Sequence, residues 1–365
     1  MLFYLIIFIV STCLVNIASR CRNGQKAMML AAGFLLPVLV ATFRSTDVGT
    51  DTVTYIELYD SIVYDENMSV ILMILDTDLF YYSICFIGQY LGGIQFVFFV
   101  YSSLTLLFLY LALDKYRRHM PVWLGYILFL FFFFNSSLNI MRQILAISFI
   151  LWATTFLFEG RKKKFIILSV ISVIFHMSAI AAAALIYVVY SISQTSRRYR
   201  SAMFFMFYLG ALFAFLCVNV VVTHMAYLGL GHSYAYTASA GHSQIGATDL
   251  LISLLLILFS YVAMKRKLVG DISNEFFYLS SIVCLLLFMT GIYNRFLMRM
   301  AYYNLTFACV YLPLILSSPK LRQKRSIYTL GVLMLGFSYW LYLFVISGSN
   351  ATLPYSTEGG LMFDF

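Results

Sequence analysis

Residues 139–176 read NIMRQILAISFILWATTFLFEGRKKKFIILSVISVIFH, and this stretch decides the fold of the chain. It holds two apolar runs, Ile144–Phe158 and Phe165–Phe175, joined by the most basic block in the sequence, RKKK. Membrane proteins keep Lys and Arg on the cytoplasmic side. The basic block is therefore expected inside, which places Arg142 and His176 toward the opposite face.

The composition agrees with a membrane protein. Of the 365 residues, 62% are hydrophobic and 11% are charged, and the mean hydropathy is +0.90. The sequence therefore predicts an all-α polytopic membrane protein, one integral membrane domain over residues 1–365 with about 10–12 transmembrane helices. The net charge of +9 reflects topology rather than nucleic-acid binding. The six cysteines have no metal-ligand spacing, so neither disulfides nor a metal site are predicted.

Basic clusters set the direction of each predicted span. With apolar runs taken as spans, all but four of the 24 Lys and Arg residues fall inside. Both termini, a large outer loop over 44–93 with an interfacial helix, and a second outer loop over 223–248 are predicted on the outside. The run 165–190 fits one long span or a re-entrant hairpin with His176 near its tip. Basic clusters at both of its ends favour the hairpin.

The four basic residues predicted outside are all arginines: Arg44, Arg142, Arg295 and Arg299. A guanidinium is planar, permanently charged and able to bind phosphate oxygens in pairs, whereas a lysine is a point charge. The pattern therefore predicts an anion-binding site at the outer face. The alternative is that each arginine extends to the membrane surface or pairs with a carboxylate of the outer loop.

The first motif is RSTDVGTDTVTY, which begins at Arg44 and follows the second predicted span. Asp51 is a candidate catalytic residue, and Arg44, Asp47 and Tyr55 are candidate substrate-binding residues. Gly49 and its Thr and Val neighbours favour a loop over a helix. An Arg44–Asp51 ion pair that ties the loop together is the structural alternative. No Asp-x-Asp occurs, so a nucleotide-sugar metal site is not indicated.

The second motif is Asn139, Arg142 and Gln143, at the start of a helix predicted to run inward. Spacings of three and four residues place Asn139 on the helical face of Arg142 and Gln143. A helix N-terminus also favours anions. Arg142 is therefore a candidate catalytic residue, with Asn139 and Gln143 as candidate substrate-binding residues.

The third motif is YNRFLMRMAYY, residues 293–303. Arg295 and Arg299 are four apart and so share a helical face, where their repulsion would be relieved by a bound anion. Arg295 is assigned to the catalytic set. Arg299, Tyr302 and Tyr303 are assigned to substrate binding.

His176 and Asp51 are the two candidates for a general base. A histidine titrates near neutral pH, which suits proton removal, and nearby arginines would keep it neutral. The same arginines would keep Asp51 ionised, which makes it a weak base but a good orienting group. His176 is therefore predicted to be the base, with Ser178 beside it as a substrate-binding or orienting residue. The alternative is a histidine with a purely structural role.

These motifs, in this order, resemble the EpsG/Wzy-type polysaccharide polymerase family. The resemblance covers nearly the whole chain, and its weight comes from the order and spacing of short motifs. The matching residues are Arg44, Gly49, Asp51 and Tyr55; Asn139, Arg142 and Gln143; His176, Ser178 and Ala179; Arg295 and Arg299; and Pro354 and Tyr355.

The resemblance implies a membrane glycosyltransferase that needs no cofactor. It would join undecaprenyl-diphosphate-linked oligosaccharide repeat units into O-antigen, capsule or exopolysaccharide at the periplasmic face of a bacterial inner membrane. Its partners would be the lipid-linked oligosaccharide, membrane lipids, and a chain-length regulator and flippase of the same pathway, with no nucleic acid. Two alternatives stay open: a flippase or transporter of lipid-linked sugars, and a membrane glycan ligase or acyltransferase.

Overall fold

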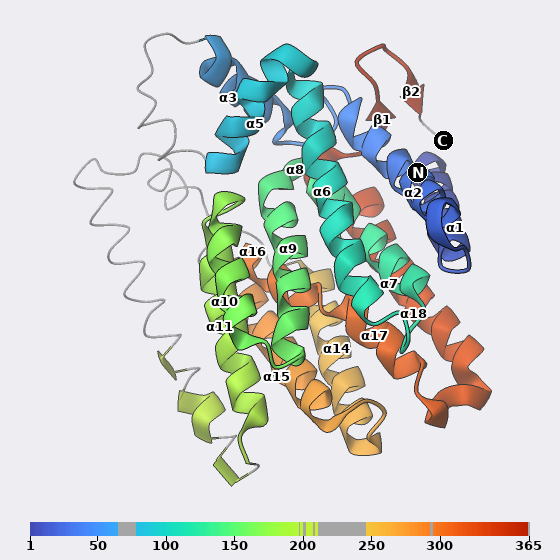
Figure 1. Cartoon of the computed structure of the whole chain (residues 1–365), viewed down its shortest axis with the longest axis vertical. Helices are drawn as coiled ribbons and strands as arrows, with labels where there is room; N and C mark the ends of the chain where they lie inside the picture. Colours follow the sequence, from blue (N-terminus) through green and yellow to red (C-terminus); the bar gives the residue numbers. More distant parts are fainter. Residues whose placement is uncertain are drawn as a thin grey trace. The chain divides into compact units, whose positions relative to one another are not determined.

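The apolar runs fold as helices in a computed structural model that describes residues 1–64, 78–196, 246–292 and 295–363, with short stretches between 198 and 210 (Figure 1). Among these residues, six helices are long and apolar enough to cross a membrane. They are Asn23–Thr42, Gly93–Lys115, Val122–Asn139, Met141–Phe158, Ala247–Arg266 and Pro319–Ile346. The predicted all-α polytopic membrane protein is therefore confirmed.

Four apolar helices are shorter. They are Leu2–Ala18, Leu79–Leu91, Ser178–Gln194 and Asn274–Met289. Six candidate spans are therefore present among the described residues, and the count of about 10–12 transmembrane helices stays a prediction. The predicted outer loop 223–248 lies outside the described residues except for 246–248, where the helix Ala247–Arg266 begins.

The chain forms two compact units, Met1–Ile180 with Thr306–Phe365, and Ala181–Leu305. The first unit holds the helices and strands α1 (Leu2–Ala18), α2 (Asn23–Thr42), α3 (Thr52–Tyr64), α5 (Leu79–Leu91), α6 (Gly93–Lys115), α7 (Val122–Phe129), α8 (Asn135–Asn139), α9 (Met141–Phe158), α10 (Lys162–Ile171), α17 (Ala308–Leu316), α18 (Arg325–Trp340), β1 (Tyr355–Ser356) and β2 (Met362–Phe363). Whether the chain acts as one membrane domain stays a prediction.

Helix α9 is the buried centre of the first unit. Its side chains are apolar around almost the whole helix, as expected of a helix enclosed by others. Phe108 of α6 lies 4.8 Å from the ring of Phe149 and 5.5 Å from that of Trp152. Between α7 and α8, the run Leu130–Phe134 forms a π-helical turn with all five side chains buried. Aromatic side chains therefore pack on α9 through Phe108, whereas the π-helical turn packs on α1 and α18, with Phe131 at 6.0 Å from Phe8 and Phe132 at 5.3 Å from Tyr339.

One end of the first unit gathers three of the basic loops that were predicted to be cytoplasmic. Lys26 of α2 contacts Asp114 of α6 at 3.4 Å, and Lys115 contacts Glu159, beyond α9, at 2.8 Å. Since α6 and α9 both end here, they run parallel to each other. The shared side of these three loops is confirmed, whereas the side of the membrane that they face stays a prediction.

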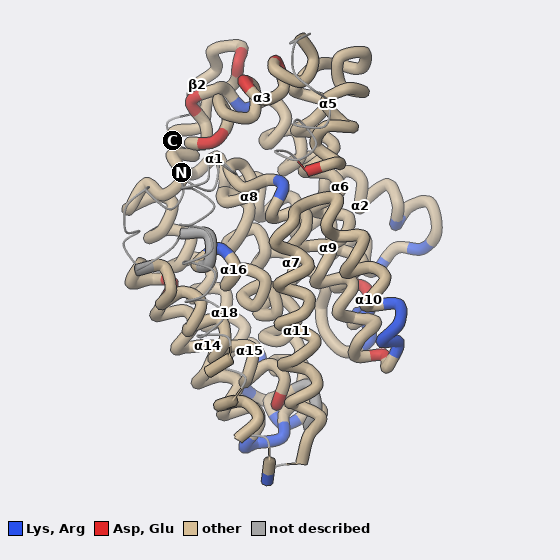
Figure 2. The backbone as a smooth tube through the Cα atoms, turned by 90° about the vertical axis from the view of Figure 1, so that its left-hand side faces the viewer, with Lys and Arg blue, Asp and Glu red and all other residues tan. Residues whose placement is uncertain are grey.

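The other end of the first unit gathers both termini. The ring of Tyr355 in β1 stacks on Phe3 at 4.6 Å, and its hydroxyl donates to the carbonyl of Val40 at 3.1 Å. The hydroxyl of Tyr4 donates to the carbonyl of Thr352 at 2.8 Å. The termini therefore share an end with the α2–α3 loop, and Figure 2 shows acidic residues around α3 and β2.

The second unit contains most of α11 (Ser178–Gln194), with α14 (Ala247–Arg266), α15 (Asp271–Met289) and α16 (Arg295–Leu305). Helices α14 and α15 run antiparallel, because Tyr261 meets Tyr278 while Ser253 meets Cys284. Helix α16 packs against α15 through a hydrogen bond of 2.9 Å from Ser280 to Asn304.

The predicted break near His176 is present. Helix α10 passes into a 3-10 turn over Ser172–Ile174, and α11 begins at Ser178. The run 165–190 is therefore two helices, not one long span. The predicted helix within 44–93 is also present as α5, whose 13 residues span about 20 Å, short of a hydrocarbon core of about 30 Å.

Candidate functional site

One carboxylate, Asp78, joins two of the residues that the sequence singled out. Its Oδ2 atom lies 3.1 Å from Nη1 of Arg142 and 3.2 Å from Nδ1 of His176. The side chain of Asp78 is 6% exposed, against 23% for Arg142 and 21% for His176. The carboxylate is therefore enclosed, while the arginine and the histidine each keep an open side.

Asp78 holds this place because it precedes the first residue of α5. Aspartate is favoured at this N-cap position, where its side chain normally accepts a hydrogen bond from the first turn. Here no such capping bond forms, and the carboxylate contacts Arg142 and His176 instead. The start of α5 thus supplies a buried negative charge to Arg142 in the first turn of α9 and to His176 in the break before α11.

Arg142 lies in the first turn of α9, where a positive side chain is unfavourable next to the positive helix end. The carboxylate of Asp78 and two aromatic faces offset this cost. The guanidinium lies 5.8 Å from the ring centre of Tyr55 and 5.5 Å from that of Tyr81. The hydroxyl of Tyr81 donates to the carbonyl of Tyr55 at 2.7 Å, which holds the two rings together. Arg142 is thereby oriented before any ligand binds.

His176 is held by the residue before it. The ring of Phe175 packs among aromatic rings of three helices, at 5.0 Å from Phe80, 6.1 Å from Phe108 and 5.1 Å from Phe149. Phe80 follows Asp78 by two positions, so the same segment of α5 holds both Phe175 and His176. Aromatic packing therefore fixes the backbone that carries the histidine.

Three helix N-termini meet at this cluster, which we call the Asp78 cluster (Asp78, Arg142 and His176). Asp78 precedes α5, Arg142 is in the first turn of α9, and His176 is two residues before α11. Helix N-termini carry partial positive charge and free N–H groups, which favour bound anions. When the carboxylate accepts the Nδ1 proton of His176, the Nε2 atom is left as a proton acceptor. The cluster can therefore bind an anion and accept a proton.

Asn139 and Arg142 do not share a helical face, which corrects the prediction from their spacing. Ile140 has φ −89° and ψ 48°, so α8 ends at Asn139 and a new helix begins at Met141. The side-chain amide of Asn139 instead donates to Thr50 Oγ1 at 3.2 Å and to the carbonyl of Asn350 at 3.1 Å. Asn139 therefore joins the α2–α3 loop to the C-terminal segment.

The family described as EpsG matches residues 27–357, which include Asp78, Arg142 and His176. The chain belongs to the EpsG family. This family is linked to exopolysaccharide biosynthesis. No curated protein and no solved structure matches the chain.

In this EpsG-family chain, Arg44 is enclosed by the protein itself. It is 2% exposed, its guanidinium lies 3.7 Å from the ring centre of Phe98, and it donates to Thr52 Oγ1 at 3.2 Å and to the carbonyl of Ala41. Burial lowers the pKa of Arg44 to about 10, which still leaves it charged at neutral pH. No ion pair joins Arg44 to Asp51 among the described residues.

The other candidates of the α2–α3 loop differ in exposure. Asp47 is exposed, and Asp51 is half-buried and accepts a hydrogen bond of 3.1 Å from Thr50. Tyr55 is buried beneath Arg142, as described above. Only the two aspartates therefore have side chains open to solvent, and their contact with substrate stays a prediction.

Two further candidates flank the Asp78 cluster in sequence. Gln143 follows Arg142 and is 4% exposed, and Ser178 follows His176 by two residues and is 5% exposed. Both make internal contacts. That Gln143 and Ser178 contact the substrate stays a prediction.

The candidates of the third motif all lie on α16, in the second compact unit. Arg299 is half-buried, the ring of Tyr302 lies 5.7 Å from that of Phe288, and Tyr303 is 1% exposed. The side chain of Arg295 lies outside the described residues. That these residues join Arg142 in one anion clamp stays a prediction.

Asp78 is the residue of the cluster that sequence reasoning missed. It is one of several acidic residues in the segment 44–93, and its distance of 98 positions from His176 hides their contact. The available signal was local, an aspartate directly before the apolar run LFYY, which is typical of a helix start. Among the described residues, no group of His, Cys, Asp and Glu is placed to hold a metal ion.

Proposed function

We propose that this EpsG-family protein is a polymerase of lipid-linked oligosaccharide repeat units, with the Asp78 cluster as its catalytic centre. The observation that carries the proposal is that one carboxylate, Asp78, forms an ion pair with Arg142 and a hydrogen bond with His176 where three helix N-termini meet. A polyprenyl-diphosphate donor needs a site for its diphosphate and an acceptor for one proton. Arg142 supplies the site for the diphosphate and His176 supplies the proton acceptor, and both contact the carboxylate of Asp78.

In the proposed reaction, a hydroxyl group of the incoming repeat unit attacks the anomeric carbon of the growing chain. The Nε2 atom of His176 takes the hydroxyl proton, and the new glycosidic C–O bond forms as the bond to the diphosphate oxygen breaks. The electron pair of that bond passes to the diphosphate, which leaves as the polyprenyl ester. Arg142 and the adjacent helix N-termini stabilise its negative charge.

Asp78 acts in this proposal through the other two residues and is a positioning residue. As acceptor of the Nδ1 proton it selects the tautomer in which Nε2 is free to accept a proton. The guanidinium of Arg142 has five N–H donors, so its contacts with Asp78 and Tyr55 leave others for the diphosphate. Asp51 is retained as a group that orients a sugar hydroxyl.

The proposal is tested by expressing variants in a strain that lacks the protein and measuring surface-glycan length. His176→Ala and His176→Gln are expected to abolish the polymer while single repeat units are retained. His119→Gln, at an exposed histidine of the α6–α7 turn, is the matched control and should give normal polymer. Loss of all surface glycan, including single units, would instead indicate the flippase or ligase. Full polymer length from His176→Gln would exclude this histidine as the base.

The positioning role of Asp78 is tested with purified protein and donor lipid extracted from the same deletion strain. Asp78→Asn should lower kcat by about 100-fold, within the range of general-base effects, and leave KM nearly unchanged. Asp78→Glu should restore part of kcat, since it keeps the carboxylate. The matched control is Asp60→Asn, an exposed carboxylate of α3. Equal loss of kcat in the Asn and Glu variants would indicate a structural role only.

The proposed reaction also requires that the Asp78 cluster face the periplasm. Gly360→Cys and Lys163→Cys, each in a cysteine-free background, place thiols at exposed positions near the two ends of the first unit. A membrane-impermeant maleimide added to spheroplasts should label position 360 and spare position 163. Labelling of position 163 in sealed spheroplasts would reverse the topology and remove the proposal.

A further inference from the structure

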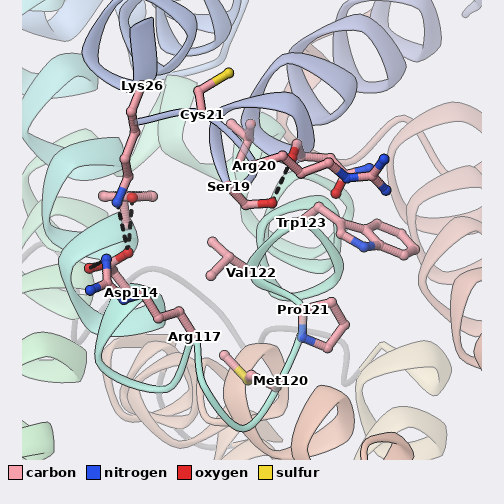
Figure 3. A pocket seen from close by; sticks show the side chains of 13 residues that line it. Ser19, Arg20, Cys21, Lys26, Asp114, Arg117, Met120, Pro121, Val122 and Trp123 are labelled. Atoms are coloured by element: carbon pink, nitrogen blue, oxygen red, sulfur yellow. Dashed lines mark hydrogen bonds and ion pairs between the residues drawn. The ribbon is translucent and has the colours of Figure 1, made fainter. Parts of the chain in front are cut away.

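A pocket lies between the α1–α2 turn and the α6–α7 turn, at the basic end of the first unit (Figure 3). Its volume is about 460 Å³, within the range of about 300–1,000 Å³ that small-molecule sites occupy. In Figure 3, Lys26, Asp114 and Arg117 lie on one side of the pocket, and Arg20 and Trp123 lie on the other. Nothing in the proposed polymerase reaction uses this pocket.

The charges of the pocket do not balance. Three cations, Arg20, Lys26 and Arg117, line it together with a single carboxylate, that of Asp114. Lys26 approaches Oδ1 of Asp114 at 3.4 Å and Arg117 approaches Oδ2 at 3.6 Å, so both oxygens of this carboxylate are already shared. Arg20 has no ion-pair partner among the described residues and is exposed. Two positive charges are left for an anion from outside the chain.

The position of the pocket indicates where that anion comes from. Helix α1 ends at Ala18, α6 ends at Lys115 and α7 begins at Val122, so three apolar helices terminate around it. Such ends lie at the level of the lipid headgroups. Trp123 is half-buried, as is typical of tryptophan at a membrane interface, and Val122 and Met120 add apolar surface.

We propose that this pocket binds the phosphate of an anionic phospholipid headgroup at the basic face of the protein. Arg20, Lys26 and Arg117 contact the phosphate oxygens, and the apolar side of the pocket contacts the glycerol and the start of the acyl chains. Basic pockets between membrane helices bind anionic headgroups by this chemistry. The site is at the opposite end of α6 and α9 from the Asp78 cluster, so it is independent of the proposed catalysis.

The test measures ligand-induced thermal stabilisation of the purified, delipidated full-length protein. The probes are dioleoylphosphatidylglycerol, dioleoylphosphatidylcholine and inorganic pyrophosphate. We compare wild type with the triple variant Arg20→Gln, Lys26→Gln and Arg117→Gln. The matched control is Arg22→Gln, Lys162→Gln and Lys163→Gln, which also removes three positive charges from the same end but none from the pocket.

Phosphatidylglycerol should stabilise wild type and the control variant to the same extent. Its affinity for the pocket variant should be lower by about ten-fold or more, because three cations are lost. Phosphatidylcholine should have no effect that depends on the pocket. If pyrophosphate instead shows the pocket-dependent effect and phosphatidylglycerol does not, the lipid is excluded and the pocket binds a soluble phosphate. If no probe distinguishes the pocket variant from the control, the proposal is overturned.

A second variant guards against misfolding of the triple variant. Asp114→Asn keeps all three cations and removes the carboxylate that competes with the headgroup. It should bind phosphatidylglycerol at least about two-fold more tightly than wild type, because one internal competitor is lost. Unchanged or weaker binding by Asp114→Asn would also overturn the proposal.

Discussion

The two ends of the first unit share one pairing pattern, a carboxylate between two basic side chains, in different surroundings. At one end Asp78 is shared by Arg142 and His176, and at the other Asp114 is shared by Lys26 and Arg117. The side chain of Asp78 is 6% exposed, whereas that of Asp114 is 29% exposed.

This difference in burial sets the strength of the two arrangements. Charges removed from water interact strongly and are costly to leave unpaired, whereas exposed ion pairs contribute about 0–1 kcal/mol. Water access, not the pairing pattern, therefore separates a preorganised centre from an adaptable binding surface.

The largest expected effect is at the buried end. Arg142→Lys should lower polymerisation by about 100-fold, because an ammonium cannot reproduce paired guanidinium contacts to a diphosphate while held by Asp78. Glycan length and in vitro turnover measure this loss. Arg22→Lys, an exposed arginine at the basic end, is the control and should retain full activity. Normal polymer from Arg142→Lys would show that the buried end needs only a positive charge.

A smaller effect is expected where the α2–α3 loop meets α8. Gly49 has φ +99°, and a Cβ there would lie 2.5 Å from Oδ1 of Asn139. Gly49→Ala should therefore lower the free energy of unfolding by about 1–3 kcal/mol, measured by thermal unfolding in detergent. The control is Gly24→Ala at the basic end, where a Cβ would meet nothing within 4 Å. Equal stability of the two variants would contradict this account of the loop.

The smallest effect is expected at the basic end. Lys115→Gln removes the ion pair of 2.8 Å with Glu159. The side chains of Lys115 and Glu159 are each more than one third exposed. The free energy of unfolding should fall by about 0.2–1 kcal/mol, and by less at high salt because the pair is screened. A loss of several kcal/mol, independent of salt, would mean that this end is as desolvated as the Asp78 cluster and would remove the contrast between them.

Much of the fold could be predicted because hydropathy and charge act over short segments. The break before Ser178 was predicted from basic clusters on both sides of one apolar run, and the short helix α5 from the length of its apolar segment. The same reasoning placed Asn139 on the face of Arg142, since spacing alone does not reveal the break at Ile140. Helix continuity there is decided by the contacts of Asn139 with two distant segments.

The candidate site was predicted in part. His176 and Arg142 were chosen from their motifs, and the structure brings them to one carboxylate. Arg44 was chosen by the same charge argument, yet it is enclosed against Phe98 and bonded to Ala41 and Thr52. A basic residue on the outer side can bind a ligand or stabilise the fold, and only its contacts in the structure distinguish these two roles.

The sequence by itself determined the membrane class, the helical segments and the grouping of basic loops on one side, because each depends on the local balance of apolar and charged residues. Only the tertiary structure decided which polar groups meet. Asp78 contacts His176 across 98 positions, and Asn139 contacts Asn350 across 211. Such contacts depend on how whole helices pack, and neither side chain carries a local signal of its partner. The Asp78 cluster is therefore a property of the packed helices.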